Sequence, residues 1–88
     1  MLIKEIEVVN RLGLHARPAT MLVKTASKYQ SKITIKKDEL SVDAKSIMGV
    51  LILAAQKGSV LRIEVDGPDE ADAAQAIADL FARGFDED

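Results

Sequence analysis

The sequence predicts an α+β fold, an open-faced two-layer β-sandwich in which three helices cover one face of a four-stranded antiparallel sheet. Two observations lead to this fold class. Four segments alternate apolar and polar residues with a period of two, and three others repeat apolar residues every three or four positions. Their order is β-α-β-β-α-β-α, and its two split β-α-β units favour one antiparallel sheet. With 88 residues, the chain should form a single domain over residues 1–88.

The predicted strands are short segments of alternating apolar and polar residues. They cover residues 2–9, residues 32–36, Leu40–Asp43 and residues 61–65. The second strand illustrates the pattern, because Ile33 and Ile35 alternate with lysine and threonine. One face of the sheet should therefore pack on a core while the other, rich in Lys, Glu and Arg, faces water.

The predicted helices have the apolar period of about 3.6 residues. We expect them at residues 16–28, Ile47–Leu53 and residues 69–83. Ser46 is placed to cap the second helix, Gly58 and Gly84 to end the second and third, and the acidic residues from Asp69 onward to face the positive dipole end of the third. The expected buried stripes are Ala19, Leu22, Val23 and Ala26 in the first helix, Val50, Leu53 and Ala54 in the second, and Ala73, Ala74, Ile77, Leu80 and Phe81 in the third.

The composition excludes several classes of protein. The chain has no cysteine, which excludes disulfides and Cys-based zinc sites and fits a reducing cytoplasm. It has no run of about 18 apolar residues, so we expect no membrane insertion, and its start lacks the apolar block of a signal peptide.

The charge distribution points to protein partners. Residues 1–65 carry eleven Lys and Arg against six Asp and Glu, a net charge of +5, whereas residues 66–88 carry one against eight, a net charge of −7. Opposite potentials of this kind steer encounters between proteins. Nucleic-acid binding modules usually add stacking aromatic residues, and this chain has only Tyr29, Phe81 and Phe85. We therefore expect no nucleic-acid partner.

The candidate reactive group is the single histidine, His15, immediately before the first predicted helix. A helix N-terminus exposes backbone N–H groups and carries about half a positive charge, so the amides of Ala16 and Arg17 could receive an anion attached to the imidazole. Arg17 adds a planar cation suited to phosphate oxygens. Pro18 fits the first turn, where its missing N–H costs no helical bond. Because imidazole is also a nucleophile near neutral pH, the pattern favours reversible attachment of a phosphoryl group.

Other interpretations of these residues stay open. A lone histidine at a helix start is often only a surface or capping residue. The length and element order also suit a small enzyme such as an acylphosphatase, although no glycine-rich arginine loop is recognisable, or a ligand- or RNA-binding module. The sequence has no P-loop, zinc spacing or nucleophilic Ser or Cys motif, so we expect neither a metal nor a cofactor.

Three segments carry a family resemblance. They are Gly13-Leu14-His15-Ala16-Arg17-Pro18-Ala19-Thr20, Thr25-Ala26-Ser27-Lys28-Tyr29 and Lys45-Ser46-Ile47-Met48-Gly49-Val50. All three resemble the histidine-containing phosphocarrier (HPr) family of the bacterial phosphotransferase system, and the resemblance extends over nearly the whole chain. It implies the same sandwich fold and a stoichiometric carrier rather than an enzyme. It further implies that Nδ1 of His15 accepts a phosphoryl group from enzyme I, charged from phosphoenolpyruvate, and passes it to an enzyme IIA, with Arg17 neutralising the phosphate.

Two helix faces are candidates for partner binding. On the first helix, one face lies opposite the buried stripe and consists of Arg17, Met21, Lys24 and Lys28. The second helix has an extra apolar stripe, formed by Ile47, Met48 and Leu51. Taken alone, the first face could be merely solvated and the second buried under a loop. The family resemblance implies instead that both bind enzyme I and enzyme IIA, and we expect the protein to be a monomer.

Ser46 is a candidate for regulatory phosphorylation. A serine here is at least an N-cap, which contributes about 1 kcal/mol. Within Lys-Ser-Ile-Met-Gly-Val it is similar to the serine that an HPr kinase/phosphorylase modifies. A phosphate at this position would add about two negative charges to the docking surface.

Leu12 departs from the family pattern. Many relatives have a polar residue there that can touch the phosphate, so its absence shifts that contact to backbone donors, Arg17 or Asn10. Residues 10–13 and the ending at residues 84–88 look more like the nitrogen-related branch, NPr, which regulates rather than feeds sugar transport. The Ser46 segment looks more like the sugar branch, so the sequence leaves the branch open.

Overall fold

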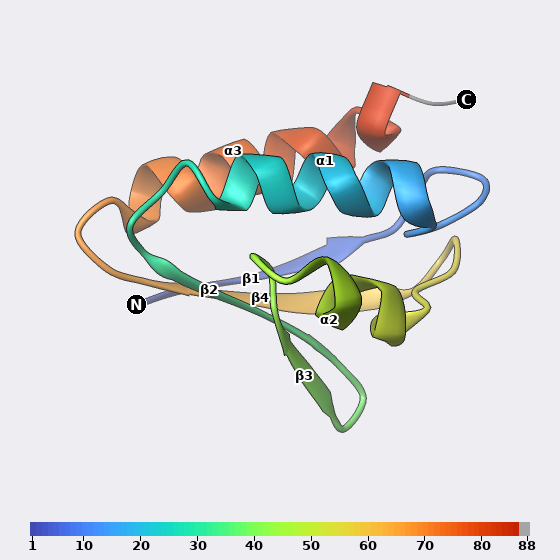
Figure 1. Ribbon diagram of the computed structural model, residues 1–88, viewed down its shortest axis with the longest axis horizontal. Helices are drawn as coiled ribbons and strands as arrows, with labels where there is room; N and C mark the ends of the chain where they lie inside the picture. The colour runs from blue at the N-terminus through green and yellow to red at the C-terminus, as the bar shows by residue number, and fades with distance from the viewer. Residues whose placement is uncertain (87–88) are drawn as a thin grey trace.

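The computed structural model describes residues 1–86 and has the predicted element order (Figure 1). The strands are β1 (Leu2–Glu7), β2 (Lys32–Lys37), β3 (Leu40–Asp43) and β4 (Val60–Asp66). The helices are α1 (Ala16–Ala26), α2 (Ile47–Leu53) and α3 (Glu70–Ala82), followed by a 3-10 turn, η1 (Gly84–Asp86). The last two residues of the acidic ending, 87 and 88, lie outside the described residues.

The four strands form one antiparallel sheet in the order β1-β4-β2-β3. Its register brings apolar residues together on one face, since Ile33 pairs with Val65, and Ile35 with both Ile63 and Val42. The three isoleucines and Val65 are buried or nearly so, as period-two alternation requires. The other face is polar, with Glu64 accepting ion pairs from Lys36 at 3.2 Å and Arg62 at 3.0 Å.

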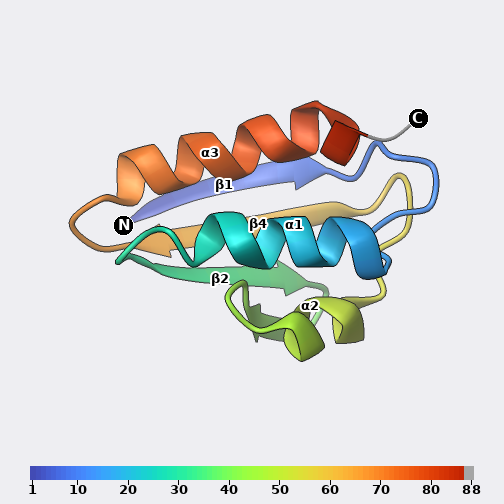
Figure 2. The same ribbon diagram turned by 45° about the horizontal axis from the view of Figure 1, so that its top comes forward.

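The helices cover the apolar face and close a single core. Helices α1 and α3 lie side by side along the sheet, and α2 lies beside α1 at the β3 end (Figures 1 and 2). The predicted stripe of α3 is entirely buried, and Phe81 meets Phe85 of η1 edge to face with ring centroids 4.8 Å apart. No helix within residues 1–86 is long and apolar enough to cross a bilayer.

The sequence-based boundaries and burial were wrong in several places. Strand β1 ends at Glu7 and α1 at Ala26, two residues early in each case. In α1, Val23 is only half-buried because it lies at the edge of the stripe.

Helix α2 does not end at Gly58 and does not bury Ala54. It ends after Leu53, because Ala54 adopts a left-handed conformation (φ 48°, ψ 40°) and turns its side chain to solvent. Gly58 lies in a later turn. At α3, Asp69 is the N-cap residue rather than part of the first turn, and its carboxylate turns toward Gln30 and Ser31.

Candidate functional site

His15 lies where a loop becomes the first turn of α1. It is the N-cap residue, with φ −77° and ψ −170°, and it is partly exposed. Its carbonyl oxygen accepts the first helical hydrogen bond, from Ala19 N–H at 3.0 Å. Because Pro18 has no N–H, helix geometry leaves Ala16 and Arg17 as the residues of this turn whose amide protons point out of the helix end. His15 therefore lies at the positive end of the α1 dipole, next to two amide donors.

The loop before His15 packs on Ala55, two residues after the end of α2. Leu14 is buried, and its N–H donates to the carbonyl oxygen of Ala55 at 2.9 Å. Gly13 has φ +68°, and a Cβ there would lie 2.3 Å from the same oxygen. Only glycine tolerates both this backbone conformation and this contact. The sequence showed Gly13 as a loop residue but gave no sign of its neighbour, which lies more than forty residues away.

Asn10 closes the loop from the inside. Its side-chain Nδ2 donates to the backbone carbonyl oxygen of Gly13 at 2.7 Å, and the backbone carbonyl oxygen of Asn10 accepts from Gly13 N–H at 3.2 Å. Only 2% of Asn10 is exposed. The contact between Asn10 and a phosphate in place of Leu12 stays a prediction, and the structure shows the Asn10 side chain buried with its Nδ2 bonded to Gly13. Leu12 itself is 66% exposed and points an apolar group at solvent near His15.

The arrangement suits an anion attached to the imidazole. Arg17 is exposed and lies on the first turn of α1, two residues after His15, with amide donors at the same helix end. A planar guanidinium and backbone N–H groups are the usual ligands of phosphate oxygens. Among residues 1–86, no three His, Cys, Asp or Glu side chains come together as metal ligands.

The predicted basic face of the first helix differs from the structure at two residues. Arg17 and Lys24 are exposed on α1, whereas Lys28 is exposed in the turn after the helix has ended. Met21 is only partly exposed and packs against the core. The side chain of Met21 thus lies between the core and the surface, which its flexible thioether can accommodate.

The extra apolar stripe of α2 lies on the surface. Met48 is 64% exposed, and Ile47 and Leu51 are each 37% exposed, while Val50 and Leu53 are buried. Ile52, which the sequence assigned to neither stripe, is 60% exposed. Because α2 packs beside α1, these apolar side chains and Lys24 of α1 belong to neighbouring helices (Figure 2).

Ser46 caps α2 as expected. Its hydroxyl oxygen accepts from Gly49 N–H at 3.2 Å, and the residue is partly exposed. Gly49 fits because a Cβ there would lie 3.2 Å from the Val42 Cβ, so α2 approaches β3 closely at this point. The cap and the exposed stripe therefore belong to the same helix.

Comparison with known proteins assigns the family. The sequence matches the family described as "PTS HPr component phosphorylation site" over residues 2–83. It is 51% identical to the phosphocarrier protein HPr of Xylella fastidiosa (strain Temecula1), covering all of this chain and 99% of that protein. The HPr of Treponema pallidum is 49% identical with complete coverage of both chains.

The fold comparison agrees. The crystal structure of HPr-C-His from Thermoanaerobacter tengcongensis superposes with a TM-score of 0.96 at 44% identity, covering all of this chain and 99% of that one. Since the relatives are phosphocarrier proteins, the acylphosphatase alternative is excluded. The chain belongs to the HPr family, the phosphocarrier proteins of the phosphotransferase system.

Proposed function

We propose that Nδ1 of His15 is the phosphoryl acceptor, that enzyme I charged from phosphoenolpyruvate is the donor, and that an enzyme IIA is the acceptor. The observation that carries this proposal is the place of His15: a partly exposed imidazole at the N-cap of α1, next to the amides of Ala16 and Arg17. The Nδ1 lone pair attacks phosphorus while the bond from phosphorus to the donor breaks. The helix end and the Arg17 guanidinium then stabilise the charge that arrives.

Reversibility follows from the same geometry. The amides and Arg17 stabilise the phosphoryl group without enclosing it, because Ala16 and Arg17 are exposed. An acceptor protein can therefore reach the phosphorus once the donor has left.

We place the carrier in the cytoplasm, because phosphoenolpyruvate is a cytoplasmic metabolite, and we propose that it acts as a monomer.

Phosphoryl uptake tests the proposal directly. Purified protein incubated with enzyme I and labelled phosphoenolpyruvate should take up one acid-labile, base-stable phosphate per chain, and ¹⁵N NMR of the ring should place it on Nδ1. His15→Ala should take up none, while its melting temperature, measured by circular dichroism, stays close to that of the wild type. Uptake by folded His15→Ala would refute the assignment, because the chain has no second histidine.

We further propose that partners dock on the exposed basic residues of α1 and of the turn that follows it, together with the exposed apolar residues of α2. Lys24 and Lys28 would attract an acidic partner. Ile47, Met48 and Leu51 would bury their exposed apolar surface against that partner. Met21 would contribute the part of its thioether that reaches the surface. In this arrangement the lysines guide the encounter with the partner, and the apolar side chains supply most of the binding energy.

Ser46 is proposed as a regulatory site for a serine kinase of the HPr kinase/phosphorylase type. A phosphate there keeps acceptor oxygens near the Gly49 amide, so the fold should tolerate it. Its charge would lie among the docking residues and weaken attraction to an acidic partner. Ser46→Asp should lower the initial rate of charging by enzyme I, whereas Ser41→Asp, which adds the same charge to exposed β3, should not. Equal rates for wild type, Ser46→Asp and kinase-modified protein would refute the role.

The regulatory NPr branch is the second candidate function. The observation that favours it is Leu12, whose exposed side chain replaces a polar neighbour of the site. A panel of enzyme IIA domains decides between the branches: transfer to sugar-specific domains supports the sugar branch, and transfer confined to nitrogen-related domains supports NPr.

A further inference from the structure

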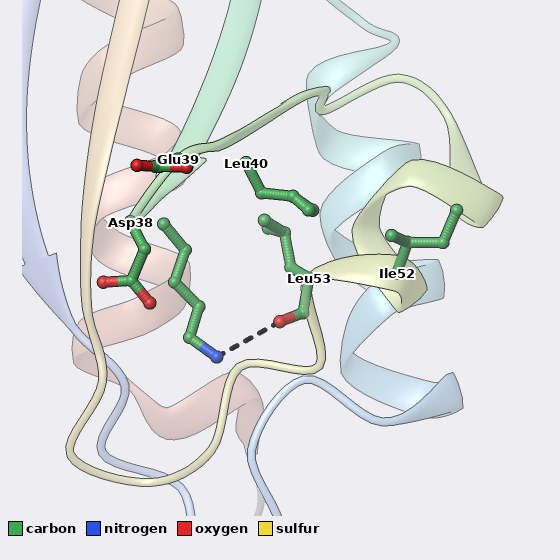
Figure 3. A pocket seen from close by; sticks show the side chains of 6 residues that line it. Asp38, Glu39, Leu40, Ile52 and Leu53 are labelled. Atoms are coloured by element: carbon green, nitrogen blue, oxygen red, sulfur yellow. Dashed lines mark hydrogen bonds between the residues drawn. The ribbon is translucent and has the colours of Figure 1, made fainter.

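The C-terminal end of α2 is held by a lysine from the sheet. The Lys37 ammonium of β2 donates to the carbonyl oxygen of Leu53 at 3.3 Å, the contact that the dashed line marks in Figure 3. Leu53 is the last residue of α2, so its carbonyl has no acceptor role within the helix and lies at the negative end of the dipole. The contact forms one wall of a shallow hollow of about 360 Å³, bordered by Leu40 and Ile52.

The residues that follow Leu53 are the support of the histidine loop. Ala54 reverses the chain in a left-handed conformation, and Ala55 is then buried with its carbonyl oxygen accepting from Leu14 N–H at 2.9 Å. Gly13 packs on the same carbonyl. Two hydrogen bonds and two intervening residues, Ala54 and Ala55, thus connect the Lys37 ammonium to Leu14, the neighbour of His15.

We propose that Lys37 is a positioning residue for His15: by holding the end of α2 it fixes the Ala54–Ala55 turn on which the histidine loop rests. A helix of seven residues is not stable alone, so its last turn depends on contacts of this kind. Movement of the turn would displace His15 relative to the amides of α1, and misplacement of a reacting group by about 1 Å can cost about 100-fold in rate. The effect on the rate of phosphoryl transfer rests on the proposed function of His15, whereas the effect on the position of the loop does not.

Hydrogen exchange of the Leu14 amide tests the structural step. Lys37→Met should raise its exchange rate about tenfold, the effect of losing one charge-assisted hydrogen bond at a partly exposed site. Lys37→Arg should keep the rate within about twofold of the wild type, because it retains a donor. Lys57→Met removes the same charge from an exposed position in the following loop and should leave the Leu14 amide protected. Ile63 of β4 reports the stability of the whole fold and should be unaffected.

The maximal rate of phosphoryl uptake from enzyme I tests the consequence for transfer. We expect Lys37→Met to lower this maximal rate while the half-saturating enzyme I concentration stays unchanged. Lys37→Arg should keep a maximal rate close to that of the wild type. Unchanged Leu14 exchange in Lys37→Met would overturn the inference, and so would a general loss of protection that includes Ile63. Failure of the wild type to accept any phosphate would instead refute the proposed function and leave the exchange result standing.

Discussion

Gly13 shows how one residue sets the position of the reactive group. Its φ of +68° is unfavourable for side-chain-bearing residues, and an added Cβ would clash with the backbone of Ala55 and Gln56. Both constraints act two residues before His15, in a loop whose next residue, Leu14, is buried. The loop is therefore fixed by backbone contacts, and the imidazole inherits its position from them.

We predict that Gly13→Ala destabilises the protein by about 2 kcal/mol or more, from the positive φ and the backbone clash together. Gly58→Ala is the matched control, because Gly58 also has a positive φ (+92°) but nothing within 4 Å of the added Cβ. It should cost only about 1 kcal/mol. Urea unfolding gives both values, and phosphoryl uptake should slow in Gly13→Ala alone. Equal losses of stability would mean that the contact with Ala55 yields when a methyl group is added.

At the scale of elements, α2 divides its apolar residues between two tasks. Val50 and Leu53 are buried in the core. The other apolar side chains of the helix are exposed: Ile47, Met48, Leu51 and Ile52. A seven-residue helix cannot cover both sets. Its last carbonyl accepts from Lys37 of β2, and at Gly49 it packs closely against Val42 of β3. Helix α2 is thus a short apolar surface held in place by tertiary contacts.

We predict that Met48→Ala slows phosphoryl transfer while changing the free energy of unfolding by less than about 0.5 kcal/mol, as expected for an exposed side chain. The matched control is Val60→Ala, which removes a similarly exposed apolar side chain (59%) from the polar face of the sheet and should not affect transfer. Leu53→Ala, in the core, should cost about 2–5 kcal/mol. Initial rates with enzyme I and urea unfolding distinguish the two tasks. A large loss of stability in Met48→Ala would assign that residue to the core.

At the scale of the whole molecule, Asp69 joins the turn between α1 and β2 to the start of α3. Its carboxylate accepts from the N–H groups of Gln30 and Ser31, each at 2.9 Å, and from the Ser31 hydroxyl. Gly67 makes this approach possible, since a Cβ there would lie 2.6 Å from the Ser31 Cα. The hydrogen bond from the Ser31 hydroxyl, then that from the Gln30 amide, lowers the pKa of Asp69 below its usual value of 3.8.

We predict a pH-dependent contribution of Asp69 to stability. Because its folded-state pKa is lowered, the ionised carboxylate stabilises the fold above pH 3.8, and this contribution is lost as the pH falls through the folded-state pKa. The difference in unfolding free energy between wild type and Asp69→Asn should be constant from pH 7 to about pH 5 and should shrink below pH 3.8. Asp72→Asn, an exposed carboxylate in the first turn of α3, controls for the loss of charge. A difference that grows at low pH would contradict the assignment.

The sequence by itself determined the elements of this protein and the place of its histidine. Alternation at Ile33, Ile35, Ile63 and Val65 specified strands with one buried face, and the helical stripe of α3 was correct at every residue. His15 before a helix start follows from the same local pattern. These features depend on residues close together in the chain, which is what periodicity reports.

Only the tertiary structure decided which distant groups meet. Four features depend on contacts between separate elements. They are the hydrogen bond of the histidine loop to Ala55, the hydrogen bonds between Asp69 and Ser31, the burial of Asn10 and the exposure of Ile52. The left-handed turn at Ala54, where no glycine marks it, arises in the same way. Local sequence does not specify the contacts between separate elements and disfavours the left-handed conformation at Ala54, so the packing of the whole chain settles these features.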